Sequence, residues 1–201
     1  MLELDTPHGQ ARAHVSRVES PVGALVLGHG SGGGIGSADL AGAARAASAA
    51  ELSVALVEQP YRVGGRRAPA PAGQLDTAWT SVISQLRAGP LEGLPILTGG
   101  RSAGARVACR TAAETGSVAV ICLAFPVHPP GRPEKSRLAE LDGVTVPVLV
   151  VQGENDPFGM PPDSPGRTVT RIAGTHSLGG AAVEAAVSAW LATAGAWPRS
   201  P

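Results

Sequence analysis

A serine flanked by glycines is the clearest sign of chemistry in this sequence. Residues 100–104 read Gly-Arg-Ser-Ala-Gly, between the apolar run 95–98 and an alanine-rich stretch. Glycines two positions before and two after a serine let a chain turn sharply from a strand into a helix, which presents the hydroxyl at the end of a sheet. The pattern therefore predicts that Ser102 is an exposed nucleophile.

Such a serine needs a base to take its proton, and the base needs an acid to orient it. After Ser102 the sequence has two histidines, His128 and His176. His176 and Asp156 each follow a predicted strand, so both should lie at the same edge of the sheet as the serine. We therefore expect His176 to be the base and Asp156 the orienting acid. Glu154, two residues earlier, is the rival acid, and we prefer Asp156 because of its position in the motif Gly-Glu-Asn-Asp-Pro-Phe at residues 153–158.

A glycine-rich loop competes for a different chemistry. Residues 28–33 match the pattern G-x-G-x-x-G, and Glu58 closes the next predicted strand, as in a dinucleotide site. A helix should then open on the third glycine, so that the pyrophosphate meets its N-terminus. The loop instead continues through Gly34 and Gly36. A dinucleotide-binding oxidoreductase is therefore our third-ranked interpretation.

These motifs need a scaffold that gathers the ends of several strands. Short, continuously apolar runs, which indicate parallel strands buried on both faces, occupy 23–28, 53–58, 95–98, 118–125 and 146–152. A weaker strand is expected at 167–173 and an exposed edge strand at 11–18. Helices are expected at 38–50, 74–88, 103–115 and 180–194. Strands alternating with helices predict an open α/β sheet with helices on both faces.

Composition excludes several classes of protein. The 201 residues suggest one domain, 1–201, and 43% hydrophobic with 16% charged residues is enough for a real core. Sixteen basic and sixteen acidic residues, with 3% aromatic residues, argue against a nucleic-acid-binding protein. No apolar run approaches the ~18 residues of a membrane span. The polar start of the chain and the two cysteines, Cys109 and Cys122, predict a cytoplasmic protein with reduced thiols and no metal site.

The motifs together resemble the α/β-hydrolase superfamily, and most closely its dienelactone-hydrolase-like group and the small Tex/KANL-type α/β-hydrolase-like domain. The resemblance covers about residues 20–192 and rests on residues 29–30, 100–104, 153–158 and 174–178. Residues 58–62 and 126–131 also look like the second group.

The resemblance implies an α/β-hydrolase fold with about seven mostly parallel strands, helices on both faces and a minimal lid or none. It implies that Ser102, His176 and Asp156 act together, and that the backbone N–H groups of Ser31 and Ala103 form an oxyanion hole. The glycine loop then approaches an oxyanion, and His29 holds that loop by hydrogen bonds.

Other residues are candidates for the substrate pocket. They are His29, Tyr61, Arg62, Arg101 and His128. Tyr61 and Arg62, with Arg66 and Arg67, belong to a Pro/Gly-rich loop that either binds an anionic substrate or is simply solvated. His128 either lines the pocket or belongs to a proline-rich surface loop. The stretch 126–145 has room for one short helix near 134–141, so we expect an open, shallow site.

The sequence therefore predicts a serine hydrolase that acts on a small ester, thioester or lactone through an acyl-Ser102 intermediate. We expect no metal and no cofactor, a small-molecule substrate, and no nucleic-acid or membrane partner. The alternative is a catalytically silent scaffold that binds a protein partner. Esterase, thioesterase, lactonase and peptidase share one site chemistry, so the sequence does not separate them, and it does not give the oligomeric state.

Overall fold

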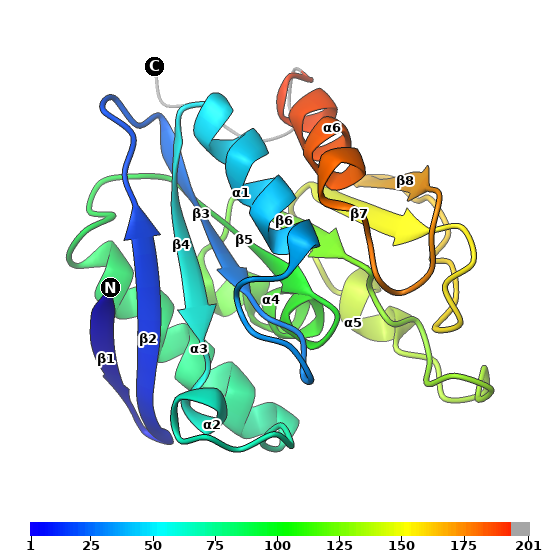
Figure 1. Ribbon diagram of the computed structural model, residues 1–201, viewed down its shortest axis with the longest axis horizontal. Coiled ribbons are helices and arrows are strands. Elements are labelled where there is room, and N and C mark those ends of the chain that lie inside the picture. Colours follow the sequence, from blue (N-terminus) through cyan, green and yellow to red (C-terminus); the bar gives the residue numbers. More distant parts are fainter. Residues whose placement is uncertain (194–201) are drawn as a thin grey trace.

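The five continuously apolar runs form the centre of a single sheet in the computed structural model, which describes residues 1–193 (Figure 1). They are β3 (Gly23–Gly28), β4 (Leu52–Glu58), β5 (Ile96–Arg101), β6 (Ala119–Leu123) and β7 (Val148–Gly153). Every residue of β3, β6 and β7 is buried, as expected for strands covered on both faces. These strands are parallel to one another, and β8 (Arg167–Ile172) extends the sheet beyond β7.

The other side of the sheet differs from the expectation. The alternating strand β2 (Gly9–Ser16) is not at the edge, because β1 (Leu2–Thr6) pairs with it through a hairpin turn at Gly9, where φ is +108°. The sheet therefore has eight strands in the order β1-β2-β4-β3-β5-β6-β7-β8, with β1 and β2 antiparallel to their neighbours. The sequence signal for β1 is weak because only Leu4 of this strand is buried.

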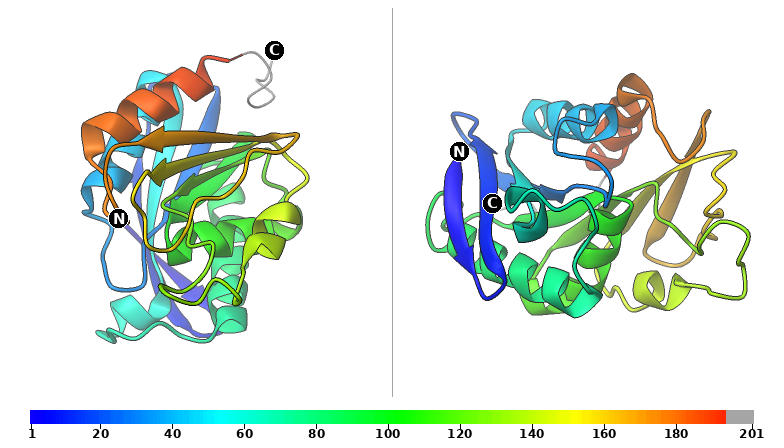
Figure 2. Two further views of the ribbon diagram at one scale, coloured as in Figure 1. Left: turned by 90° about the vertical axis from the view of Figure 1, so that its right-hand side faces the viewer. Right: turned by 60° about the horizontal axis from the view of Figure 1, so that its bottom comes forward.

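Helices cover both faces of the sheet (Figures 1 and 2). On one face, α1 (Ala38–Ala49) and α6 (Gly180–Leu191) pack on side chains such as Leu25 and Leu27. On the other, α3 (Ala72–Arg87) packs on Ala24 and Val26, and α4 (Ala103–Thr115) packs on β6 and β7. Successive side chains of β3 thus pack on opposite faces of the sheet, as the alternation of a strand requires.

Two short helices complete the fold. The first, α2 (Pro60–Val63), falls where a loop was expected, and α5 (Leu138–Asp142) lies close to the expected short helix. The predicted end of the last helix, residue 194, lies outside the described residues. Between β6 and β7 the chain contains α5 alone, so the prediction of a minimal lid is confirmed.

The parallel strands all point their carboxyl ends to one edge of the sheet. In the pairing of β3 with β5, Gly28 lies opposite Gly100, so the glycine loop starts beside the serine turn. No helix within residues 1–193 is long and apolar enough to span a membrane.

Candidate active site

Ser102 alone links β5 to α4, in a strained backbone conformation. Its φ is 50° and its ψ is −105°, a region that residues other than glycine rarely adopt. The turn is possible because Gly100 and Gly104 both pack against the backbone of Gly28, where an added Cβ atom would overlap the carbonyl oxygen. The Ser102 N–H donates a 2.9 Å hydrogen bond to the Leu123 carbonyl at the end of β6. The sequence pattern thus produces the sharp strand-to-helix turn that it predicts.

The structure brings Ser102, His176 and Asp156 together in one line of hydrogen bonds. His176 Nε2 lies 2.9 Å from Ser102 Oγ, and His176 Nδ1 lies 2.9 Å from Asp156 Oδ2. An ionised carboxylate can only accept, so the proton of the neutral ring is on Nδ1 and Nε2 is left to accept from the serine hydroxyl. The side chain of Asp156 is 1% exposed and that of His176 is 18% exposed. The acid is thus buried behind a histidine that reaches the surface.

Two further residues hold this arrangement, and the sequence assigned neither of them a role. The buried Gln152 donates to Asp156 Oδ2 at 2.9 Å, and the Phe158 N–H donates to Asp156 Oδ1 at 2.8 Å. The Phe158 ring also stacks on His176, with centroids 4.0 Å apart. Glu154, the rival acid, is an exposed residue of the turn after β7, and no side-chain contact joins it to His176.

The glycine loop is supported from behind by two buried rings. The Gln59 N–H donates to His29 Nε2 at 3.1 Å, so His29 Nδ1 carries the proton and donates to the Gly30 carbonyl at 2.8 Å. Burial lowers the pKa of His29, which favours the neutral ring that these bonds require, although the bond to Gly30 opposes that shift. The Tyr61 hydroxyl donates to the Ser31 carbonyl at 3.2 Å, and its ring meets His29 edge to face.

A cavity of about 390 Å³ opens over the serine. Its wall includes Ser31, Arg101, Ala103, Phe158 and His176 around Ser102. The N–H of Ala103 is the first of α4 and has no acceptor within the helix, so it is available to a ligand. The two residues expected to form an oxyanion hole therefore face the same cavity as the hydroxyl.

Of the five expected pocket residues, the structure places only Arg101 on the wall of this cavity. His29 and Tyr61 lie behind the glycine loop, since their polar atoms are used to hold its carbonyls. Arg62 belongs to α2, outside the cavity. His128 is also outside the cavity wall: its backbone N–H donates to the Phe158 carbonyl at 3.0 Å, and its ring Nδ1 donates to the Pro129 carbonyl at 2.9 Å.

Comparison with known protein families assigns the chain to one of them. Residues 21–179 match the family model described as an alpha/beta hydrolase domain. The chain belongs to the α/β-hydrolase family. No curated protein sequence is similar enough to the chain to count as a match.

Solved structures share the fold of this α/β-hydrolase over nearly the whole chain. An alpha-beta serine hydrolase homologue from Coxiella burnetii has 19% identity and a TM-score of 0.75, covering 95% of this chain and 96% of that one. An a/b serine hydrolase without lid from Xanthomonas campestris has 23% identity and a TM-score of 0.69, covering 96% and 95%. A dienelactone hydrolase from Anabaena variabilis has 17% identity and a TM-score of 0.71, covering 94% and 93%.

Arg101 connects three loops of the α/β-hydrolase site. Its Nε donates to the buried Asp39 of α1 at 2.8 Å, and its Nη2 donates to the His176 carbonyl at 3.2 Å. The guanidinium also packs on Gly30, where an added Cβ would lie 2.8 Å from Nη1. The serine turn, the glycine loop and the histidine loop therefore meet at one side chain. Asp39 had no distinguishing pattern in the sequence.

The geometry of a dinucleotide site does not form. The first helix after the glycine loop begins at Ala38, well beyond Gly33, so it does not open on the third glycine as a pyrophosphate site requires. Glu58 contacts His14 of β2 at 3.0 Å instead of a ribose site.

Proposed function

We propose that this α/β-hydrolase is a serine hydrolase that cleaves a small ester, thioester or lactone through an acyl-Ser102 intermediate. The observation that carries the proposal is the continuous line of hydrogen bonds from Ser102 Oγ through His176 to Asp156. The family match and the fold shared with serine hydrolases support the same class of reaction.

In the proposed mechanism, Ser102 Oγ attacks the carbonyl carbon while His176 Nε2 takes the hydroxyl proton. Asp156 keeps the ring in the tautomer that accepts at Nε2 and stabilises the cation that forms. The N–H groups of Ser31 and Ala103 stabilise the oxyanion of the tetrahedral intermediate. His176 then gives its proton to the leaving group, and a water molecule repeats the sequence to release the acid.

The open cavity supports a small-molecule substrate. At about 390 Å³ it has room for a compact ester but not for a long acyl chain enclosed on all sides. We also propose a cytoplasmic location, because the buried Cys109 and Cys122 are free thiols, as is usual in a reducing compartment.

A fluorophosphonate probe tests the proposal, because only an activated serine reacts with it quickly. We expect labelling of the wild type at Ser102 and turnover of short activated esters. Ser102→Ala should abolish labelling. His176→Ala should lower kcat by about 10⁴–10⁶-fold, and the double variant Ser102→Ala/His176→Ala should lose little more. Asp156→Asn should lower kcat about 10⁴-fold by favouring the wrong tautomer.

Ser177→Ala is the matched control, since this exposed serine lies next to His176 and should leave labelling unchanged. Labelling that survives Ser102→Ala would show that another residue is the nucleophile. A folded wild type that neither reacts with such probes nor hydrolyses any small ester or thioester would favour a silent scaffold instead.

A further inference from the structure

Arginine side chains dominate the charge of the cavity over Ser102. Four of them line it: Arg101, Arg106, Arg110 and Arg137. No aspartate or glutamate of the described residues lines the same cavity. Three carboxylates pair with the arginines without lining the cavity, so the wall presents hydrogen-bond donors and positive charge to a ligand.

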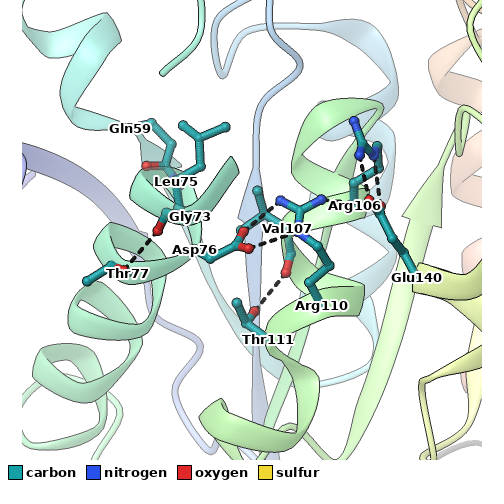
Figure 3. Close-up of polar contacts among 10 residues, drawn as sticks. All are labelled: Gln59, Gly73, Leu75, Asp76, Thr77, Arg106, Val107, Arg110, Thr111 and Glu140. Atoms are coloured by element: carbon teal, nitrogen blue, oxygen red, sulfur yellow. Dashed lines mark hydrogen bonds and ion pairs between the residues drawn. The ribbon is translucent and has the colours of Figure 1, made fainter. Parts of the chain in front are cut away.

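Three of these arginines already have carboxylate partners. Arg101 is paired with the buried Asp39. In Figure 3, Nε and Nη2 of Arg110 donate to the two carboxylate oxygens of Asp76 in α3, at 2.8 and 2.6 Å, and Arg106 makes a similar two-pronged pair with Glu140 of α5. Glu140 also accepts from Arg110 at 3.2 Å.

Arg137 is different, because its side chain has no hydrogen-bond or ion-pair partner within residues 1–193. Only its backbone is bonded: the N–H donates to the Val127 carbonyl at 2.7 Å, and the carbonyl accepts from the Glu140 N–H at 3.0 Å. These bonds fix the base of the side chain at the start of α5. Partial burial and the neighbouring Arg106 both lower the pKa of Arg137, while Glu140 opposes them. The guanidinium is therefore a half-buried cation with a carboxylate, Glu140, in its neighbourhood but none bonded to it among the described residues.

We propose that Arg137 binds a carboxylate group of the substrate, so that the enzyme prefers acidic esters over neutral esters of the same length. This rests on the proposed hydrolase function, because the same cavity contains Ser102. An arginine fork matches the two oxygens of a carboxylate, and a hydrogen bond between charged groups is stronger than one between neutral groups.

The charge count favours a group with a single negative charge. Four arginines and three partner carboxylates leave an excess of one positive charge at the wall. A carboxylate neutralises that excess, whereas a phosphate monoester carries about two negative charges near neutral pH. We therefore expect a monocarboxylate and not a phosphate.

Matched substrates test the proposal. Mono-4-nitrophenyl adipate and 4-nitrophenyl hexanoate have the same chain length and leaving group, and they differ by a carboxylate on the acyl part. The pair 4-acetoxybenzoate and phenyl acetate differs by a carboxylate on the alcohol part. In at least one of these pairs, we expect kcat/KM for the acidic ester to exceed that of its neutral partner roughly 10- to 100-fold, after subtraction of uncatalysed hydrolysis. The preference should decrease as salt is added.

Variants of the loop separate Arg137 from general charge. Arg137→Gln should bring the acidic-to-neutral ratio close to one, and Arg137→Lys should give an intermediate ratio because it keeps the charge but not the fork. Arg132→Gln is the matched control, since Arg132 is exposed in the same loop and is not part of the cavity wall. Equal rates within each pair for the wild type, or a preference that survives Arg137→Gln, would overturn the proposal.

A binding measurement keeps this result distinct from failure of the hydrolase function. Calorimetry with monomethyl adipate, which carries one carboxylate, and the Ser102→Ala variant needs no turnover and should show binding that Arg137→Gln weakens at least tenfold. Absence of monomethyl adipate binding to a folded protein would contradict the anion site even if the serine is labelled. Tighter binding of inorganic phosphate than of monomethyl adipate would contradict the assignment to a monocarboxylate.

Discussion

His29 and His176 show how partners decide whether a histidine can accept a proton. His176 Nδ1 faces the Asp156 carboxylate, which stabilises a positive ring, and its Nε2 is left for the serine. His29 Nε2 accepts a hydrogen bond from the Gln59 N–H, and the residue is 3% exposed. A second proton on His29 would therefore cost both a hydrogen bond and desolvation of a charge. The first ring is suited to proton transfer, and the second is suited to holding the glycine loop.

His29 should therefore make the protein less stable as the pH decreases below 6.5. Burial lowers its pKa below 6.5, so below pH 6.5 and above that lowered pKa the unfolded chain binds more protons than the folded one. The free energy of unfolding should be unaffected by His29 above this window and fall as the pH decreases through it, by at most about 1.4 kcal/mol per pH unit.

Urea unfolding of the wild type and His29→Gln between pH 5 and 7.5 measures this. The variant should be less stable at neutral pH and should show a smaller pH slope. His8→Gln, at an exposed position of the β1–β2 turn, should keep the slope of the wild type. An unchanged slope in His29→Gln would contradict the argument.

At the scale of elements, strands buried on both faces were predictable because burial leaves continuous apolar runs, as in β3 and β7. The hairpin strand β1 was not, since one buried leucine in five residues gives no periodic signal. Likewise, the serine, acid and base of the proposed mechanism follow strand ends and could be found by position. Arg137 and the Arg106–Glu140 pair were invisible, because their significance depends on loops that only folding brings to the cavity.

The tether made by Arg101 and Asp39 should affect catalysis more than substrate affinity. Arg101→Met removes the hydrogen bond to the His176 carbonyl and leaves the buried Asp39 carboxylate without its arginine partner. Asp39→Asn removes the charge that holds the arginine in place. A displacement of about 1 Å at the reacting groups costs roughly 100-fold in rate, so we expect kcat to fall about 10- to 100-fold. The KM of a short neutral ester should change much less.

The fluorophosphonate labelling rate and a double-variant cycle measure this tether. Because the two residues act as a unit, the double variant should lose little more than either single variant. Arg45→Met provides the control, since it breaks the exposed ion pair to Glu184 and should leave the labelling rate unchanged. Additive losses, or full labelling rates in both single variants, would show that Arg101 does not position the histidine.

At the scale of the whole molecule, the crossing of α1 and α6 connects two parts of the site. The glycine loop leads into α1, and the loop that carries His176 leads into α6. The two helices lie side by side on one face of the sheet (Figure 1). They approach so closely at Gly42 and Gly180 that a Cβ on Gly42 would overlap the Gly180 carbonyl. The packing of this layer therefore sets how the base and the proposed oxyanion hole stand relative to each other.

Gly42→Ala should consequently destabilise the fold although alanine is the better helix former. The gain of up to about 1 kcal/mol in helix propensity is smaller than the cost of overpacking, about 1–3 kcal/mol. The melting temperature should fall by about 2–4 °C for each kcal/mol lost. Gly73→Ala in α3 is the matched control: an added Cβ there meets nothing within 4 Å, so the substitution should stabilise by about 0.4–1 kcal/mol. Thermal unfolding of both variants measures the difference. A Gly42→Ala protein as stable as Gly73→Ala would mean that the two helices can separate freely, and that their crossing does not constrain the loops of the active site.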